Sequence, residues 1–248
     1  MGGASIFVTR ASIRVYSTGM GMITRPKVLL AWSSGKDSAW ALHVLRQEAR
    51  VEVVGLLTTL TEDYRRVAMH AVREAILEAQ AAAVGLHLHE IYLPSPCSND
   101  DYAALMADAL ARYAGTGLSA VAFGDLFLPD VRAYREEQLA AVGLAALFPL
   151  WGRDTGLLAR EMIAGGLRAI VTCIDPRQLD PAFVGHAFDE RFLADLPPGV
   201  DPCGERGEFH TCVTAGPMFA APIPVVPGEV VERDGFVFAD LMLLPKVC

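Results

Sequence analysis

The chain has 248 residues, 52% of them hydrophobic, which is enough for one large α/β domain with or without a small appendage. No apolar run approaches the roughly 18–20 residues that a membrane-spanning helix needs. A net charge of −8 without any Lys/Arg cluster disfavours a nucleic-acid partner. The five cysteines form no C-x-x-C pair, so we expect free thiols in the cytoplasm rather than disulfides or a zinc site. They are Cys97, Cys173, Cys203, Cys212 and Cys248.

Residues 1–26 differ from the rest of the chain because they contain three arginines and no acidic residue. An organelle transit peptide has this composition, but the segment lacks a clear amphipathic period. We therefore interpret it as a non-essential tail, or as sequence upstream of a true start at Met20 or Met22.

From residue 27 onward, short apolar runs alternate with stretches in which apolar residues recur at helical spacing. Strands are predicted at 27–32, 51–59, 86–93, 119–123, 144–148 and 168–173. Helices are predicted at 37–49, 69–84, 100–114, 131–142 and 155–164. This alternation is typical of βαβ crossovers, so it predicts a doubly wound α/β fold with a mostly parallel sheet and helices on both faces.

The regular alternation ends near residue 175. Prolines and glycines become dense there, and only short strand-like runs follow, at 209–214 and at 230–238 around the turn Asp234-Gly235. We therefore predict a nucleotide-binding α/β domain over residues 27–175 and a smaller, mixed substrate-binding region over residues 176–248.

The first candidate site is the segment that joins the first predicted strand to the first predicted helix, Ser33-Ser34-Gly35-Lys36-Asp37-Ser38. Free N–H groups and the helix dipole favour an anion at such a turn. Small residues let the backbone approach phosphate oxygens, and Lys36 adds a positive charge. Asp37 would repel phosphate unless it binds a metal such as Mg²⁺ or caps the helix. The spacing fits neither Walker A nor the dinucleotide-binding glycine pattern, and a plain turn capped by Asp37 or Ser38 is the alternative.

A second candidate follows the strand at 119–123. Ligands of open α/β sheets bind beyond the carboxyl ends of the strands. Gly124 would permit close approach to a nucleotide, and Asp125 would bind a ribose or a metal. An ordinary turn at the end of the strand explains the pair equally well. The charged residues at 132–137 fit a solvated helix face.

The third candidate is Cys203-Gly204-Glu205-Arg206-Gly207-Glu208-Phe209-His210-Thr211. Glycines indicate an exposed loop, and loops on a rigid scaffold carry sites. Glu205 and Glu208 are candidates for binding ammonium or acting as a general base, and His210 is a candidate proton shuttle. A polar β-turn beside a strand is the alternative. Cys203 fits a small packed residue better than a nucleophile.

The loop at 33–38 closely resembles the S-G-G-x-D-S loop of the PP-loop ATP pyrophosphatases. Together with Cys203–Thr211, Gly124-Asp125 and the stretch at 150–154, it resembles the diphthamide synthase (diphthine–ammonia ligase) family over roughly residues 27–225. Phrases such as Arg66-Val67-Ala68-Met69-His70 resemble the bacterial branch of that family. Three positions depart from the family pattern: Ser34 and Arg206 replace loop glycines, and His210 replaces a glutamate.

The resemblance implies an AMP-forming ligase that uses ATP with Mg²⁺. Such an enzyme adenylylates a carboxylate, small or carried on a protein, and amidates it with ammonia. It implies that Ser33, Ser34, Gly35, Lys36, Asp37, Ser38, Gly124 and Asp125 bind the nucleotide. Lys36, Glu205, Glu208 and His210 would then act in catalysis and Asp37 would hold the metal. A bacterial-branch protein would use a different acceptor, and a homodimer is compatible. An RNA-modifying PP-loop enzyme and a non-catalytic nucleotide-binding regulator remain alternatives.

Overall fold

The computed structural model describes residues 25–67 and 70–244. Almost all of the predicted tail, the start of the helix predicted at 69, and Cys248 therefore lie outside the described residues. No helix among the described residues is long and apolar enough to cross a membrane.

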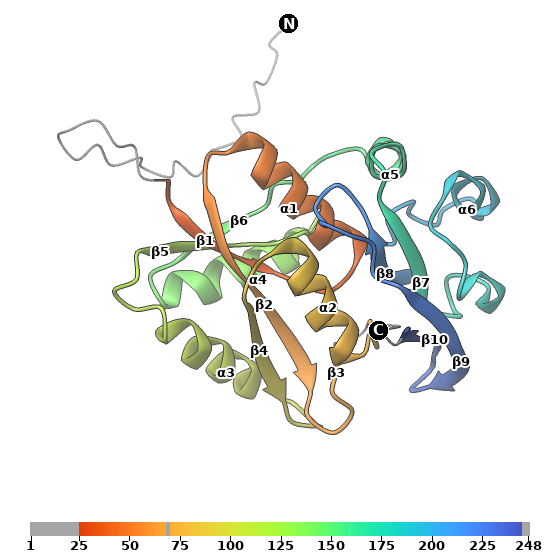
Figure 1. Cartoon of the computed structure of the whole chain (residues 1–248). Helices are drawn as coiled ribbons and strands as arrows, with labels where there is room; N and C mark the ends of the chain where they lie inside the picture. Colours follow the sequence, from red (N-terminus) through yellow and green to blue (C-terminus); the bar gives the residue numbers. More distant parts are fainter. Residues whose placement is uncertain (1–24, 68–69, 245–248) are drawn as a thin grey trace, which may run out of the picture.

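The larger sheet has six strands (Figure 1). Five of them are parallel, in the spatial order β4, β2, β1, β5 and β6, and the short β3 pairs antiparallel with β2. Their bounds are β1 Lys27–Ala31, β2 Glu52–Thr61, β3 Arg66–Val67, β4 Leu88–Leu93, β5 Leu118–Ala122 and β6 Ala145–Leu147. The predicted doubly wound, mostly parallel α/β fold is confirmed.

Helices cover both faces of this sheet because successive residues of a strand point to opposite faces. Val28 and Leu30 pack into the core formed with α1 (Lys36–Glu48), α2 (Glu74–Val84) and α5 (Thr155–Ala164). Leu29, between them, packs on the other side with α3 (Asn99–Ala111) and α4 (Pro129–Ala141). Strands buried on both faces read as continuous apolar runs, as they do here.

A second sheet of four antiparallel strands follows in the order β8, β7, β10 and β9. The bounds are β7 Arg168–Ile174, β8 Phe209–Ala215, β9 Val225–Arg233 and β10 Phe236–Leu243; a 3₁₀ turn (Pro181–Phe183) and α6 (Glu190–Asp195) lie between β7 and β8. The prediction that the strand at 168–173 continues the parallel sheet is therefore wrong. An apolar run of this kind predicts a buried strand but does not specify which sheet it joins.

Two local predictions have different outcomes. The Asp234-Gly235 turn joins β9 to β10, and both residues have positive φ (53° and 78°), as a two-residue hairpin requires. The helix predicted at 69–84 begins instead at Glu74. Arg66 and Arg73 form a β-bridge across the preceding turn, and both donate to the carboxylate of Asp240 on β10. These contacts hold the segment before α2 out of the helix.

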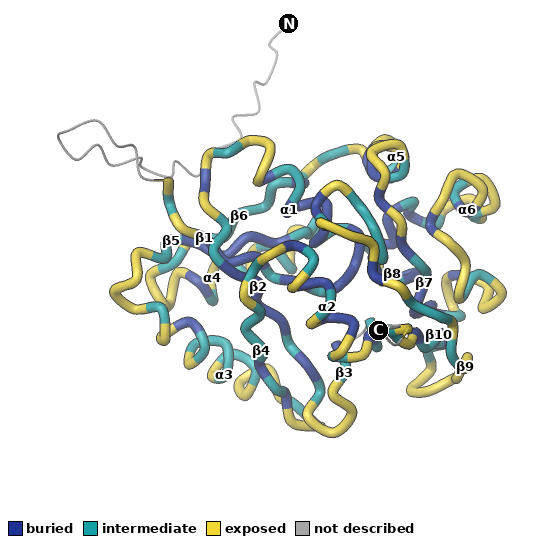
Figure 2. Tube along the Cα trace, viewed as in Figure 1, coloured by how far each residue is buried: buried dark blue, intermediate teal, exposed yellow. Residues whose placement is uncertain are grey.

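The two sheets share one hydrophobic core. Buried residues of α1 and α2, such as Leu42 and Ile76, belong to the same cluster as Val171 of β7 and Val213 of β8. In Figure 2 the buried segments run from the parallel sheet into β7 and β8, while the hairpin of β9 is largely exposed. This packing brings β8 alongside the start of α1.

Candidate functional site

A cavity of about 380 Å³ lies at the carboxyl ends of β1, β2 and β5, where it is closed by the segment before β8 and by β8 itself. Several residues singled out in the sequence line this cavity: Ser33, Lys36, Asp37, Ser38, Gly124, Asp125, Glu205 and His210. The structure thus brings the three sequence candidates together, although they are more than 160 residues apart at the extremes.

The segment at 33–38 is the turn between β1 and α1. Gly35 precedes the helix without a side-chain cap. The N–H of Lys36 donates to Oγ1 of Thr211 at 3.1 Å, and the Ser38 hydroxyl donates to the Gly35 carbonyl at 3.0 Å. The hydroxyl oxygens of Ser33 and Ser38 lie 3.2 Å apart. A helix start whose N-cap residue offers no side-chain acceptor, and of which only the first N–H is satisfied by Thr211, has the geometry of an anion site.

Ser34 has a structural position within this turn. Its φ is 68°, in the left-handed region that favours glycine. Its carbonyl accepts from the N–H of Val213 at 2.9 Å and from the buried amide of Gln80 at 3.2 Å. The hydroxyl is buried without a hydrogen-bond partner in the part of the chain that the structure describes. Ser34 therefore ties the loop to β8 through its backbone, and its side chain lies outside the cavity lining.

Lys36 is 2% exposed and reaches toward the C-terminal segment. Its Nζ donates to Oδ2 of Asp37 at 2.9 Å and to the Cys203 carbonyl, and lies 5.6 and 5.3 Å from the ring centroids of Phe188 and Phe209. Burial opposes its charge, but the neighbouring carboxylate of Asp37 outweighs this and raises the pKa of Lys36. The side chain is thus an ion-paired link between the loop and the second sheet.

Asp37 presents one carboxylate oxygen to Lys36 and leaves the other free. Its Oδ1 is buried and has no hydrogen-bond partner among the described residues. Burial raises the pKa of Asp37, the Lys36 ammonium opposes that rise, and Asp201 and Asp125 add to it. A buried, unpartnered carboxylate oxygen at a cavity wall has the chemistry of a ligand for a hard cation.

Gly124 lies directly against the first turn of α1. A Cβ at this position would lie 2.8 Å from the carbonyl carbon of Asp37 and 2.8 Å from the amide nitrogen of Ser38. The residue is therefore required for close packing of backbone on backbone. Beside it, the Asp125 carboxylate pairs with Nε of Arg135 at 3.0 Å, and the Arg135 guanidinium lies 4.4 Å from the ring centroid of Phe123.

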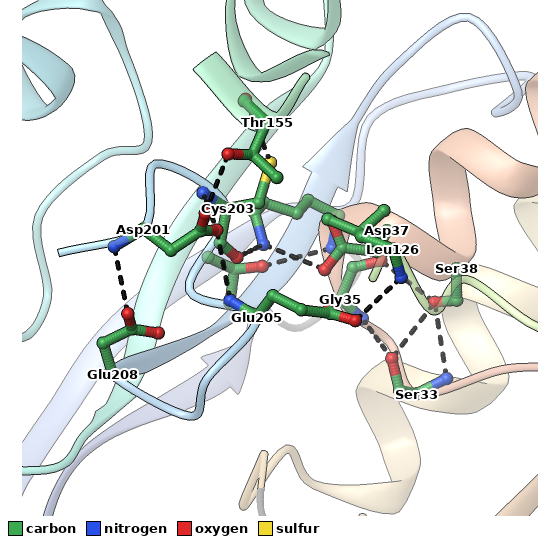
Figure 3. A network of polar contacts seen from close by, with 12 residues as sticks. Ser33, Gly35, Asp37, Ser38, Leu126, Thr155, Asp201, Cys203, Glu205 and Glu208 are labelled. Atoms are coloured by element: carbon green, nitrogen blue, oxygen red, sulfur yellow. Dashed lines mark hydrogen bonds and ion pairs between the residues drawn. The ribbon is translucent and has the colours of Figure 1, made fainter. Parts of the chain in front are cut away.

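Glu205 bridges the C-terminal segment and the loop after β5 (Figure 3). One oxygen, Oε1, accepts from the N–H of Leu126 at 2.7 Å and from that of Phe127 at 3.4 Å. Burial raises the pKa of Glu205 to about 7, against the lowering effect of the Leu126 N–H and with a further increase from Asp37. The side chain is therefore poised to exchange a proton near neutral pH.

Glu208 points the other way. Its two oxygens accept separately from the N–H of Asp201 at 3.0 Å and that of Arg206 at 2.9 Å, and it is 2% exposed. It is absent from the cavity lining and lies at the far end of the segment in Figure 3. Glu208 therefore holds the shape of its own turn.

The same turn is organised from within by Asp201. One of its oxygens accepts from the N–H of Cys203 at 2.9 Å, and the other accepts from the Thr155 hydroxyl at 2.7 Å. The Cys203 thiol is buried and donates to the Thr155 carbonyl at 3.4 Å. Burial raises the pKa of this thiol, so it is not activated as a nucleophile.

His210 lies on β8 against a second imidazole, that of His70, with ring centroids 4.6 Å apart. His70 Nδ1 lies 3.2 Å from the Thr211 carbonyl, and its ring fills the space where a side chain on Gly35 would lie. Nε2 of His210 is buried without a partner within the described ranges. Burial lowers the pKa of His70 to about 4, and it lowers that of His210 well below its usual value.

The sequence analysis missed several residues of the site. Gln80 is a polar residue in an otherwise apolar helix segment, which is a readable signal; it is fully buried and links Trp32, Ser34 and Val213. Arg135 was grouped with a solvated helix face, but it lines the cavity. His70 stands in a phrase that resembles the bacterial branch of the family, but nothing in that phrase indicated a site residue, and Asp201 carried no signal; only the fold brings them to the cavity or to the Glu205 turn.

The chain was compared with protein-family models, and two match. The diphthamide synthase N-terminal domain matches residues 26–145, and the diphthamide synthase C-terminal domain matches residues 154–240. The chain belongs to the diphthamide synthase family. The N-terminal match carries the loop at 33–38, and the C-terminal match carries Glu205, Glu208 and His210, so both halves of the cavity lie within matched regions.

Curated relatives bear the same family's name. A diphthine–ammonia ligase of Bos taurus is 33% identical over 123 residues, which cover 47% of this chain and 46% of the bovine protein. One of Rattus norvegicus is 27% identical over 237 residues, covering 86% of this chain and 87% of the rat protein, and one of Mus musculus is 28% identical over the same length. The match to the bovine protein thus spans about half its length, whereas the rodent matches extend over most of both chains.

Proposed function

We propose that this member of the diphthamide synthase family is an ATP-dependent, AMP-forming ligase that adenylylates a carboxylate and amidates it with ammonia. The observation that carries the proposal is the single cavity in which the uncapped start of α1 faces Glu205. The names of the curated relatives, diphthine–ammonia ligases, support the same reaction class.

The phosphates of ATP would lie against the turn at 33–38. The backbone N–H groups of the first turn of α1 that follow Lys36 are donors fixed before the substrate arrives, which is the arrangement that stabilises charge developing on a leaving pyrophosphate. The apolar part of the cavity, lined by Leu57, Met106 and Phe123, suits a flat base. This division of the cavity fits cleavage between the α- and β-phosphates.

A magnesium ion fits the residues that are present. The free Oδ1 of Asp37 would hold it, with Asp125 nearby as a second carboxylate. When bound, the ion would neutralise phosphate charge and align the oxygens of the polyphosphate. The protein's own contribution is the orientation of Asp37, because Lys36 holds the other oxygen.

Glu205 is our candidate for the proton transfer of the amidation step. Ammonia loses a proton when it becomes an amide nitrogen, and a carboxylate with a pKa of about 7 is suited to accept it. The Leu126 N–H fixes one oxygen of the side chain, so the carboxylate has a defined orientation in the cavity. Glu208, which is turned away, would only position the segment that carries Glu205.

The test is a screen of carboxylic acids with ATP, Mg²⁺ and ammonium chloride, followed by phosphorus NMR. AMP and pyrophosphate should accumulate with the correct acid, and ADP should not. Accumulation of ADP and orthophosphate would overturn the reaction class even if ATP binds. ATP binding without any turnover across the screen would favour a nucleotide-binding regulator instead.

A matched pair of variants tests the metal ligand. Asp37→Asn should raise the Mg²⁺ concentration needed for turnover, because it removes the negative charge of a cavity-lining carboxylate with an unpartnered oxygen. Asp130→Asn removes the same charge from an exposed position at the start of α4 and should leave the Mg²⁺ dependence unchanged.

A further inference from the structure

The cavity lacks free positive charge for a polyphosphate. The Lys and Arg side chains that line it are Lys36 and Arg135, and the carboxylates are Asp37, Asp125 and Glu205. Both cations are already paired, Lys36 with Asp37 at 2.9 Å and Arg135 with Asp125 at 3.0 Å. A bound triphosphate therefore needs positive charge beyond what these side chains offer, and one bound divalent ion leaves part of its charge unmatched.

Besides Lys36 and Arg135, the lining side chains that can become positively charged are two imidazoles. The ring of His70 packs on the loop itself, because a Cβ on Gly35 would lie 2.8 Å from its Cε1. The Thr211 carbonyl can only accept, so His70 Nδ1 carries the hydrogen of their 3.2 Å contact and Nε2 keeps its lone pair. The neighbouring His210 ring has a buried Nε2 that no described residue satisfies. Nε2 of each imidazole is thus without a hydrogen-bond partner among the described residues, and the pair can take up a proton there.

We propose that His70 and His210 form a proton-binding part of the polyphosphate site, in which the pair takes up one proton as ATP binds and presents an N–H donor to the phosphates. The proposal rests on the proposed function, since it requires ATP at the loop. The proton comes from solvent and returns to it when pyrophosphate leaves. Only one proton is expected, because two charged imidazoles in contact would repel each other.

The direction of the pH dependence follows from the surroundings of the pair. Without a ligand, the pKa of His70 is lowered to about 4, chiefly by burial and to a smaller extent by the Lys36 ammonium, while the Thr211 carbonyl acts in the opposite direction. His210 is lowered by burial, by His70 and by Lys36. A polyphosphate anion beside Gly35 raises both values. Proton uptake therefore occurs at pH values between the pKa of the free pair and that of the complex, and ATP affinity increases as pH falls through this range.

The experiment is calorimetric titration of the full chain with a non-hydrolysable ATP analogue and Mg²⁺, at about pH 6 in two buffers of different ionisation enthalpy. For each nucleotide bound, the wild-type protein should take up about one proton more than the double variant His70→Gln/His210→Gln. Because both proteins are compared at the same pH, protons bound or released by the phosphates of the nucleotide itself contribute equally and cancel. The double variant should also bind about tenfold more weakly, as expected for loss of a charge-assisted hydrogen bond.

Two controls assign the proton. His186→Gln removes an exposed imidazole away from the cavity and should leave the uptake unchanged. Glu205→Gln removes the other group that titrates near neutrality, and wild-type uptake in this variant supports the pair. The proposal is overturned if proton uptake is lost in Glu205→Gln. It is also overturned if the wild-type protein and the histidine double variant take up the same number of protons.

Nitrogen-15 NMR provides a readout that does not depend on substituting the pair. The nucleotide analogue should shift the imidazole signals of the His70–His210 pair toward the protonated form by the equivalent of one proton for the two rings together. Binding without such a shift refutes the inference and leaves the ligase proposal intact. Absence of any nucleotide binding would refute both.

Discussion

Glu205 and Glu208 lie three residues apart, yet the structure predicts opposite consequences for the same isosteric substitution. Both side chains accept backbone hydrogen bonds. Glu205 receives its two N–H groups on one oxygen, whereas Glu208 receives one N–H on each oxygen. Glutamine has a single acceptor oxygen and an NH₂ group in place of the other. Whether the two N–H groups share one carboxylate oxygen or use both therefore determines how many hydrogen bonds each glutamine variant loses.

In Glu208→Gln, the new NH₂ must face either the N–H of Asp201 or that of Arg206. One hydrogen bond becomes a contact between two donors, and one buried N–H is left unsatisfied. Such a group costs about 1–3 kcal/mol, and the remaining bond loses its charge assistance, so we expect a loss of about 3 kcal/mol in the free energy of unfolding. Turnover per folded molecule should stay close to the wild-type value.

In Glu205→Gln, the amide oxygen can keep both N–H contacts of Oε1. The variant loses charge assistance, but it also removes the unfavourable burial of a charge. These effects oppose each other, and we expect a stability change within about 1 kcal/mol. Turnover should fall by about 100-fold or more, since a glutamine cannot accept the proton released from ammonia.

The assay combines urea unfolding, followed by circular dichroism, with AMP release measured on the same preparations. An unchanged m value would show that each variant alters stability rather than the extent of unfolding. The reasoning is refuted if Glu208→Gln unfolds within about 0.5 kcal/mol of the wild type, a range typical of surface substitutions. It is equally refuted if Glu205→Gln retains full turnover per folded molecule.

Four further predictions concern single positions. Because burial raises the pKa of Glu205 to about 7, its stabilising contribution is complete below the unfolded pKa and is lost as pH rises through about 7. In Glu205→Gln this pH-dependent loss of unfolding free energy, which amounts to no more than about 2 kcal/mol after solvent screening, should disappear when urea unfolding is measured across pH. Ser34→Gly should stabilise the protein by about 1 kcal/mol because it relieves a positive φ and removes an unpartnered hydroxyl, whereas Ser34→Ala, which keeps the φ, should gain less in the same measurement. Gly124→Ala should destabilise by about 2 kcal/mol or more through contact with helix backbone, while Gly156→Ala, in a roomier position of α5, should be neutral or stabilising in thermal unfolding. Cys203→Ala should retain turnover per folded molecule, and loss of AMP release from folded protein would restore this thiol as a nucleophile candidate.

Much of the first sheet could be predicted from the sequence because its signals are local. Apolar runs gave five parallel strands, and helical spacing gave the covering helices to within a few residues, apart from the start of α2. The membership of β7 could not be predicted in this way. Its run Arg168–Ile174 is as apolar as a central parallel strand, and only its pairing with β8 and β10 distinguishes it. Strand partners are set by tertiary packing, which a single sequence does not encode in any short window.

The candidate site was predicted in its composition but not in its geometry. Loop glycines and a strand–turn–helix context were enough to indicate the turn at 33–38. The direction in which each side chain points was not readable. Only two residues separate Glu205 from Glu208, yet one enters the cavity and the other turns inward to its own loop. The catalytic roles of Lys36, Glu205, Glu208 and His210 stay predictions.

Lys36 illustrates how a motif residue acquires a function that its charge alone does not suggest. Burying an ammonium costs several kcal/mol; the pairing with Asp37 and the Cys203 carbonyl outweighs that cost for the charged form, but an apolar side chain of similar volume would incur no such cost. Stability therefore gives little reason for a lysine here. Its geometry gives a better one: Nζ holds Oδ2 of Asp37 and leaves Oδ1 unpartnered among the described residues, and it simultaneously holds the segment that carries Glu205. One buried cation thus aligns the candidate metal ligand and the candidate base with the same phosphate loop. We infer that Lys36 acts as a positioning residue rather than as a contact to phosphate.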